Sequence, residues 1–223
     1  MGTVTKLPKR IRQRQDIYRI FRPGTLFTHD IWPIIQSSSF TKQNFYLPEF
    51  QIDGDIFHTK QKLIKQIFKY NSATKEKIDN LKNRVKPPYI AIHVRRGDKL
   101  VSEAKRIEID SYIAAIQRVP SRSKCVFIAT DDFAVIREFQ QSCPTYEIFT
   151  FCTSDQNGYQ QSNFNKATNE QKYSETIQLL TDIECMSKAQ HFIGTFSSNI
   201  GRFIALRLGL NKCTSLDESW HPL

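Results

Sequence analysis

From residue 86 onward, short apolar runs alternate with stretches of helical periodicity. Four runs are apolar on both faces, as strands of a parallel sheet are when helices cover it, and they span residues 89–96, 125–130, 146–151 and 191–196. Helical spacing follows each run, over residues 110–119, 133–141, 171–188 and 198–208. Strict alternation of strand and helix predicts a right-handed, doubly wound parallel sheet, and the predicted fold class is α/β.

The first 85 residues show a different pattern. Prolines and a run of three serines interrupt residues 1–55, which we expect to be irregular. Helical spacing appears over residues 58–85 and stops at Pro87-Pro88. We therefore predict two domains: residues 1–85, made of a basic arm, an irregular segment and helices, and residues 86–223, which hold the sheet.

The chain is basic, with 32 Lys and Arg against 22 Asp and Glu, a net charge of +10. Part of this excess lies in an N-terminal arm, at Lys6, Lys9, Arg10, Arg12, Arg14, Arg19 and Arg22. Such an arm is typical of a solvated segment. It also suits an anionic partner, such as nucleic acid, an acidic membrane or a phosphate-bearing ligand.

The cysteines and the apolar runs limit the cellular setting only loosely. Five cysteines are scattered without a CxxC pair, and an odd number cannot all pair within one chain, so buried thiols and a partly disulfide-bonded fold both stay open. No apolar run has the length of a transmembrane helix, and the start lacks a signal-peptide apolar region. As it stands we expect a soluble chain, with any anchor upstream if the sequence is truncated. The oligomeric state is not defined.

Polar side chains follow three of the four predicted strands. Ligands of open parallel sheets bind beyond the carboxyl ends of the strands, so these side chains are candidates for one site. They are His93, Arg95, Arg96, Asp98 and Lys99 at the end of the first strand, Asp131 and Asp132 after the second, and Ser197 and Ser198 after the fourth.

The strand ends suit an anion better than a metal. Guanidinium forks bind phosphate oxygens with two hydrogen bonds, and the start of a helix offers free N–H groups. The alternatives are an Arg–Asp pair that steadies the loop and a plain serine helix cap. Asp131-Asp132 and the DxD sequence Asp53-Gly54-Asp55 are weak metal signals, since Asp is common in caps and turns. We predict no metal site.

Three motifs resemble those of the α1,6-fucosyltransferases, which include the eukaryotic enzymes of the N-glycan core and bacterial nodulation enzymes. They are HVRRGDKLVSEAKRIEIDSY, FIATDD and DIECMSKAQHFIGTFSSNIGR, in the family's order and spacing. The resemblance covers roughly residues 57–218 and implies a Rossmann-like, GT-B-type nucleotide-sugar domain. Nothing in residues 1–56 resembles the family's N-terminal segment, so the N-terminal part is a shortened remnant of that lobe. Gly97 replaces the usual Thr, and Gly194 and Gly201 replace two cysteines.

The resemblance also implies an activity: inverting transfer of fucose from GDP-β-L-fucose to a glycan hydroxyl, without metal or other cofactor. It assigns a general base, Glu103, and cations at the β-phosphate, Arg95, Lys99 and Arg96, together with Ser198 and its neighbour Ser197. It places His93 and Asp182 at guanine. The sugar and acceptor side takes Asp98, Asp131 and Asp132, and Tyr112 is a further site position.

The partners implied are a GDP-sugar donor and an oligosaccharide or glycoprotein acceptor, either the N-glycan core or a chitin oligomer. By resemblance the compartment is the Golgi lumen if the N-terminus is truncated. Two alternatives stay open. One is a non-catalytic remnant that binds a GDP-sugar weakly or not at all. The other is a nucleic-acid-binding protein that uses the basic arm, although no nucleic-acid partner is expected.

Overall fold

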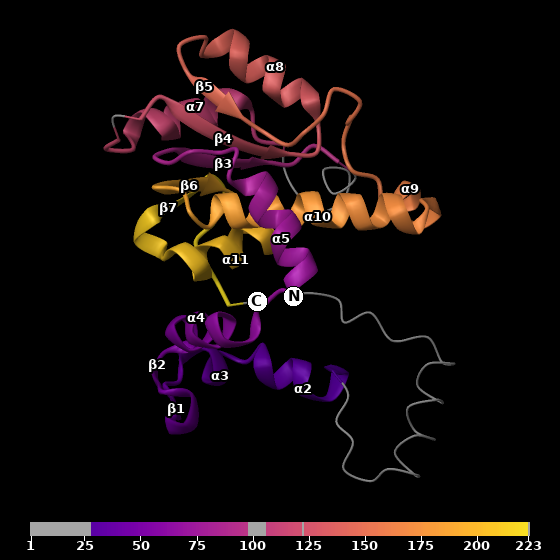
Figure 1. Cartoon of the computed structure of the whole chain (residues 1–223). Helices are drawn as coiled ribbons and strands as arrows, with labels where there is room; N and C mark the ends of the chain where they lie inside the picture. Colours follow the sequence, from indigo (N-terminus) through magenta and orange to yellow (C-terminus); the bar gives the residue numbers. More distant parts are fainter. Residues whose placement is uncertain (1–27, 98–105, 122, 223) are drawn as a thin grey trace. The chain divides into compact units, whose positions relative to one another are not determined.

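The computed structural model describes residues 28–97, 106–121 and 123–222 (Figure 1). These residues form two compact units, residues 28–56 and residues 57–222. The predicted boundary at residue 85 differs from this division, because the helices of residues 58–85 belong to the same unit as the sheet. Among the described helices, none combines the length and apolar character needed to cross a bilayer.

The first unit contains short regular elements where the sequence predicts irregular structure. Helices α2 (Thr28–Ile35) and α3 (Ser38–Lys42) precede an antiparallel hairpin of β1 (Phe45–Leu47) and β2 (Ile52–Gly54), joined by the 3-10 turn η1 (Pro48–Phe50). The backbone N–H of Phe40 donates to Ser37 Oγ at 3.2 Å and so caps α3. Strands of three residues are too short to show a period in the sequence, which is why the hairpin was not predicted.

The second unit is built on a parallel sheet, as the sequence predicts, with five strands where four were predicted. Its strands are β3 (Ile90–Val94), β4 (Cys125–Thr130), β5 (Glu147–Phe149), β6 (His191–Gly194) and β7 (Cys213–Ser215), in the order β5-β4-β3-β6-β7. All neighbouring pairs are parallel. The chain builds outward from β3 to β5, then returns to the other side of β3. The point between β3 and β6 is therefore the topological switch, where ligands of such sheets bind.

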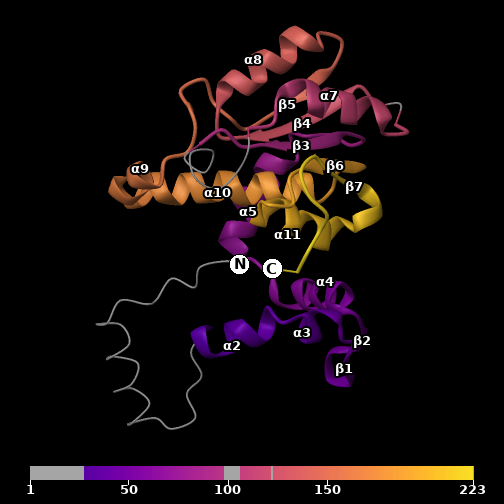
Figure 2. The same ribbon diagram turned by 180° about the vertical axis from the view of Figure 1, so that it is seen from behind.

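Helices cover both faces of the sheet, which confirms the doubly wound class (Figures 1 and 2). Helices α7 (Ile109–Arg118) and α8 (Phe133–Ser142) cover one face, and α10 (Asn169–Met186) and α11 (Asn199–Leu208) cover the other. Alternate strand residues fill the two cores. Ile92 and Val94 of β3 pack on the side of α7 and α8, whereas Ala91 packs with residues of α10 and α11.

Further elements complete this unit. They are α4 (Ile56–Ile67), α5 (Ser72–Lys82), α9 (Gln161–Lys166) and the 3-10 turn η2 (Leu210–Lys212). Helix α5 packs against α10, its Ile78 is 1% exposed, and Val85 after it joins the core beneath the sheet. Burial of this apolar face ties α5 to the sheet, and the sequence alone does not show that contact.

Candidate functional site

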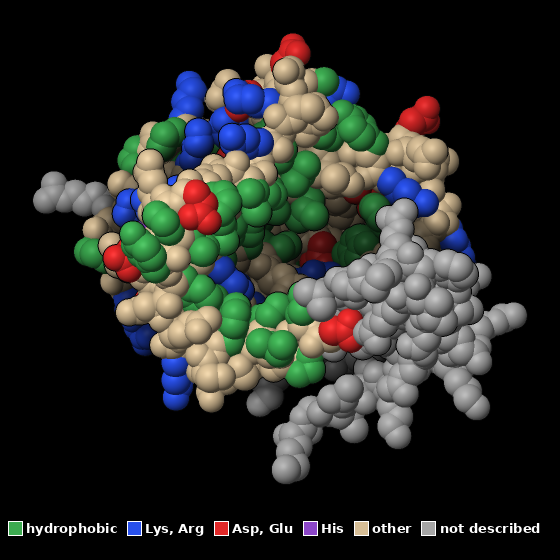
Figure 3. Space-filling model, turned by 90° about the horizontal axis from the view of Figure 1, so that it is seen from below, with side chains coloured by type: hydrophobic (Ala, Val, Ile, Leu, Met, Phe, Trp, Pro, Cys, Tyr) green, Lys and Arg blue, Asp and Glu red, His purple; other side chains and the backbone are tan. Residues whose placement is uncertain are grey.

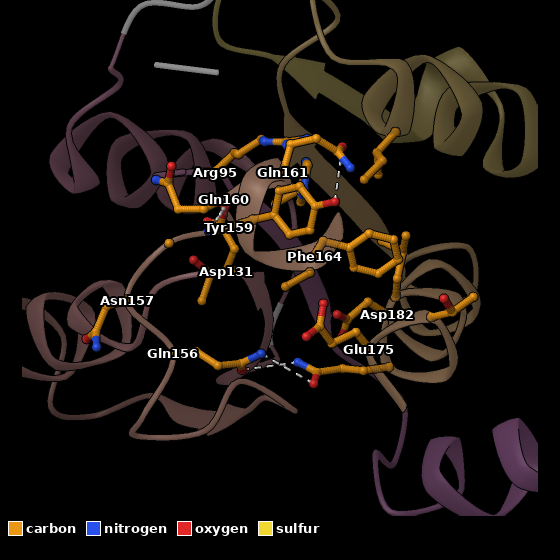
Figure 4. Close-up of a pocket in the computed structure, with 18 of the residues that line it drawn as sticks. Arg95, Asp131, Gln156, Asn157, Tyr159, Gln160, Gln161, Phe164, Glu175 and Asp182 are labelled. Atoms are coloured by element: carbon orange, nitrogen blue, oxygen red, sulfur yellow. Dashed lines mark hydrogen bonds between the residues drawn. The ribbon is translucent and has the colours of Figure 1, made fainter. Parts of the chain in front are cut away.

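A cavity of about 730 Å³ opens at the carboxyl ends of β3 and β4 (Figure 4). The strand ends supply His93, Arg95 and Asp131, the segment 155–164 supplies one wall, and α10 supplies another. Ile200, in the first turn of α11, also contributes. The cavity therefore lies where the strand-end rule predicts a ligand.

His93 stands at the end of β3 and is 8% exposed. Burial lowers the pKa of its imidazole to about 4, although the charge of Asp131 opposes the shift. The ring is therefore neutral at neutral pH. Among the described residues its Nδ1 has no hydrogen-bond partner. The hydroxyl of Tyr112, on α7, donates to the carbonyl oxygen of His93 at 3.2 Å. Tyr112 thus supports the strand end from behind rather than lining the cavity.

Asp182 faces the cavity from α10 and is also 8% exposed. Its Oδ1 has no hydrogen-bond partner among the described residues. Burial raises the pKa of this carboxyl well above its ordinary value, because the charged form loses its hydration. Two polar atoms that lack partners within residues 28–97, 106–121 and 123–222, one on His93 and one on Asp182, thus border one cavity. Such atoms are rare in folded proteins and indicate a place where a ligand can hydrogen-bond.

The two arginines after β3 diverge. Arg95 lines the cavity, and its guanidinium carbon lies 5.7 Å from the centre of the Tyr159 ring. Arg96 donates to the carbonyl oxygen of Ile107 at 3.1 Å and pairs with Glu138 at 3.4 Å. Its side chain is only 5% exposed. Neighbouring residues of an extended chain point to opposite sides. Arg96 therefore steadies the strand end, and the structure does not bring it to the predicted phosphate wall.

The two aspartates after β4 also separate. The Asp131 carboxylate borders the cavity and accepts from the backbone N–H groups of Arg96 at 2.8 Å, Gly97 at 3.0 Å and Tyr159 at 3.1 Å. It thus holds the bend after β3 to the segment after β5. Asp132 caps α8 by accepting from Ala134 N at 2.9 Å and does not line the cavity. Its role in the structure is the cap.

Glycine at position 97 is required by this clamp. A Cβ atom built there would lie 2.3 Å from the carbonyl oxygen of Tyr159 and 2.7 Å from Asp131 Oδ2. Gly201 meets a similar limit, since its Cβ would lie 2.0 Å from the carbonyl oxygen of Thr195. At both positions this chain has glycine where the α1,6-fucosyltransferases that it resembles have a larger residue. With this backbone no side chain fits at either position.

The serines before α11 do not line this cavity. Ser197 Oγ donates to Asp217 Oδ2, and Phe196 N donates to Asp217 Oδ1 at 2.8 Å. An internal carboxylate thus occupies donors of the turn that the sequence assigned to phosphate. Ser198 is the N-cap residue of α11 but makes no side-chain cap bond. Three predicted residues, Asp98, Lys99 and Glu103, lie outside the described residues.

Sequence reasoning missed much of the cavity wall. Tyr159, Phe164, Glu175 and Leu179 all line the cavity. Figure 4 shows Tyr159, Phe164 and Glu175 directed toward its centre. The ring centres of Tyr159 and Phe164 lie 5.9 Å apart. The signal in the sequence was the polar segment 153–169, rich in amides after the third strand. Its composition does not tell which side chains face inward.

The DxD sequence lies at the end of strand β2 and directly after it. Asp53 lies in β2, opposite Tyr46, and no group of three His, Cys, Asp or Glu in the described part of the chain could hold a metal ion. The five cysteines are free thiols in the structure.

On the face shown in Figure 3, Lys and Arg side chains of the described residues lie at several separate places among polar and hydrophobic ones.

A five-stranded parallel sheet with a cavity at the carboxyl ends of its central strands β3 and β4 defines a Rossmann-like ligand-binding domain. The particular family follows from comparison. Residues 47–215 match the family model described as alpha-(1,6)-fucosyltransferase N- and catalytic domains. Because this match covers well over half of the sequence, the chain belongs to the α-(1,6)-fucosyltransferase family. The resemblance predicted from the motifs is confirmed.

Two relatives are named alpha-(1,6)-fucosyltransferase. The one from Caenorhabditis elegans is 26% identical over 151 residues, 62% of this chain and 26% of the relative. The one from Drosophila melanogaster is 26% identical over 125 residues, 52% of this chain and 19% of the relative. The chain thus spans about a quarter or less of their length. The crystal structure of POFUT1 in complex with GDP-fucose matches 74% of this chain and 49% of that chain, with 14% identity and a TM-score of 0.46.

Proposed function

We propose that this chain binds GDP-fucose in the cavity and transfers fucose to a hydroxyl of an oligosaccharide or glycoprotein. The observation that carries the proposal is a pair of buried atoms, His93 Nδ1 and Asp182 Oδ1, which have no hydrogen-bond partner in the described part of the chain and border the same cavity as Arg95. Leaving a polar atom buried without a partner costs about 1–3 kcal/mol. A ligand that hydrogen-bonds both atoms would recover this cost.

Guanine and a diphosphate fit these groups. Guanine presents its N1–H and exocyclic amine side by side, and one carboxylate can accept from both, which is the role we assign to Asp182. The neutral His93 ring would bind the same base through Nδ1. Arg95 would bind the β-phosphate through its planar fork. Family membership supports the same donor.

The transfer itself would be an inverting displacement without metal. The acceptor oxygen attacks the anomeric carbon, the bond from that carbon to the β-phosphate oxygen breaks, and GDP leaves. Glu103 would take the acceptor's proton, a step that contributes about 10²–10⁴-fold in such reactions. Arg95 and Lys99 would stabilise the negative charge that develops on the β-phosphate. The roles of Glu103 and Lys99, outside the described residues, rest on the motif resemblance.

The acceptor we propose is the core of an asparagine-linked glycan or a chitin oligomer, and the compartment that goes with the former is the Golgi lumen. A second candidate follows from coverage: the chain spans only 26% and 19% of its two relatives. It would then be a non-catalytic part that binds a GDP-sugar. Replacing Glu103 with Gln separates the two, since fucose transfer would fall while a binding part loses nothing.

The first experiment measures thermal unfolding with GDP, GDP-fucose and UDP. A ligand at about 100 times its Kd stabilises the folded state by about 2.7 kcal/mol, which raises the Tm of a chain this size by about 5 °C or more. We expect this rise with the guanine nucleotides only. Arg95→Ala should remove most of it. Arg137→Ala is the matched control, because Arg137 lies exposed on α8, away from the cavity.

Transfer is then measured as GDP released from GDP-fucose with a glycan acceptor, in the presence of EDTA. GDP binding with no turnover on either acceptor class would favour the non-catalytic candidate. A Tm unchanged by every guanine nucleotide would reject both candidates.

A further inference from the structure

Helix α10 presents one stripe of side chains to the cavity. Glu175, Leu179 and Asp182 are spaced by four and three residues, so they lie above one another on a single helix face. Figure 4 shows Glu175 and Asp182 on this wall of the cavity. Two carboxylates with an apolar residue between them thus form one surface.

The carboxylate of Glu175 makes no contact that supports the fold in the part of the chain that the structure describes. Glu175 is exposed, and among the residues described it has no hydrogen-bond or ion-pair partner. The nearest lysine toward the start of the helix, Lys172, instead donates to the carbonyl oxygen of Asn165 at 3.0 Å. The side chains of Gln178 and Gln156 bond to each other and fix this part of α10 to the segment after β5. Glu175 therefore stands on a supported wall with its oxygens available.

The spacing along the stripe matches the length of a nucleoside. Seven residues of α-helix rise about 10.5 Å, so a base held at Asp182 would place its sugar toward Glu175. Leu179 lies between them, is 44% exposed, and offers an apolar surface to the ring faces. A ribose carries two adjacent hydroxyls, and one carboxylate can accept from both, as acidic residues do at the ribose of other Rossmann-like sites.

We propose that Glu175 binds the 2′- and 3′-hydroxyls of the bound nucleotide and makes the cavity selective for ribonucleotides. This inference rests on the proposed function, because it takes the ligand of the cavity to be a guanine nucleotide. It adds a specificity-determining residue that neither the motifs nor the strand-end rule indicates.

The test compares the affinities of GDP and 2′-deoxy-GDP by isothermal titration calorimetry. A hydrogen bond to a charged group is strong enough that the wild-type chain should prefer GDP by about tenfold or more. Glu175→Ala should weaken GDP binding and reduce this preference to about twofold or less. Glu175→Gln keeps the shape and one acceptor but loses the charge, so its preference should be intermediate.

Glu170→Ala is the control, since Glu170 lies exposed in the first turn of the same helix and does not line the cavity. It should keep the full preference. Equal binding of GDP and 2′-deoxy-GDP by the wild type, or an unchanged preference in Glu175→Ala, would overturn this inference and leave the proposed function standing. Absence of GDP binding in the wild type would overturn both.

Discussion

Helix α10 carries two buried carboxylates two residues apart, and the structure treats them in opposite ways. Asp182 and Glu184 are each 8% exposed. Two residues turn an α-helix by about 200°, so the side chains leave on nearly opposite faces. Asp182 faces the cavity with one oxygen lacking a partner among the described residues, whereas Glu184 faces α11 and is fully bonded. Equal burial therefore does not mean equal role.

The partners of Glu184 form a closed group. Both terminal nitrogens of Arg207 donate to its oxygens, one of them at 3.0 Å, and the hydroxyl of Tyr70 donates at 2.9 Å. The guanidinium of Arg207 also lies over the rings of Phe68 and Phe203, at 5.5 and 5.9 Å. Burial raises the pKa of the Tyr70 hydroxyl, and the charge of Glu184 raises it further. A carboxylate with this set of partners holds α10, α11 and the α4–α5 connection together.

The largest expected effect comes from breaking this closed group. Glu184→Ala leaves the partly buried Arg207 without its carboxylate, and removing one partner of such a pair costs about 3–5 kcal/mol. We expect a loss near the lower limit, because Arg207 keeps 22% of its side chain exposed. Urea unfolding measures the change in the free energy of unfolding. A loss of unfolding free energy below about 1 kcal/mol would mean that the Glu184–Arg207 pair contributes little to stability. Glu184 and Asp182 would then not differ in their effect on stability.

The sequence predicted the framework of the fold for a clear physical reason. Long apolar runs between helices can only be buried strands, and β3, β4, β5 and β6 lie where these runs stand. The strand β7 and the helix α9 were missed. Elements of three and six residues carry too little of a period to be seen, and only packing against longer neighbours stabilises them.

The site was predicted at the level of strand ends but not of side-chain direction. His93, Arg95, Asp131 and Asp182 line one cavity, and their roles at a nucleotide stay predictions. Arg95 and Arg96 look alike in the sequence, and only the pleat decides which one reaches the cavity.

The sequence also does not show that Asp182 and Glu184 have different roles, because the contacts of a side chain are made with residues far away in the sequence. For Glu184 that partner is Arg207, 23 residues on. The role of each carboxylate is therefore a property of the packed structure.

The second prediction concerns pH and tests whether His93 belongs with Asp182. The folded imidazole has a pKa of about 4 against 6.5 in the unfolded chain. Between these values the unfolded state binds more protons, so stability falls as pH falls from 6.5 to 4. Lowering the pKa from 6.5 to about 4 corresponds to about 3 kcal/mol in total. The wild-type chain should lose this free energy of unfolding between pH 7 and pH 4, and His93→Gln should not. Urea unfolding of both chains at the two pH values measures the difference. If both chains lose the same free energy between pH 7 and pH 4, the pKa of His93 is not lowered in the folded state and the prediction is wrong.

The smallest expected effect concerns Asp182, whose replacement should stabilise the chain, whereas replacing Glu184 should destabilise it. The pKa of Asp182 is raised by burial, so the folded state holds a proton that the unfolded state has lost above about pH 4. Stability therefore falls as pH rises from 3.8 toward the raised pKa. Asp182→Asn replaces a carboxyl that resists ionisation with a neutral amide of the same shape. We expect it to raise the free energy of unfolding at pH 7 by about 1–2 kcal/mol, a gain typical of relieving a functional site.

The same substitution should weaken GDP binding, because an amide cannot accept from two guanine donors as a carboxylate does. Binding to the wild type would then require Asp182 to ionise, so GDP affinity should rise with pH, and calorimetry in buffers of different ionisation enthalpy should detect a released proton. Glu184→Gln is the matched comparison: it should destabilise the fold and leave this proton release intact. If both amides destabilise the chain alike, Asp182 is a second structural carboxylate, and the cavity loses the group on which base recognition depends.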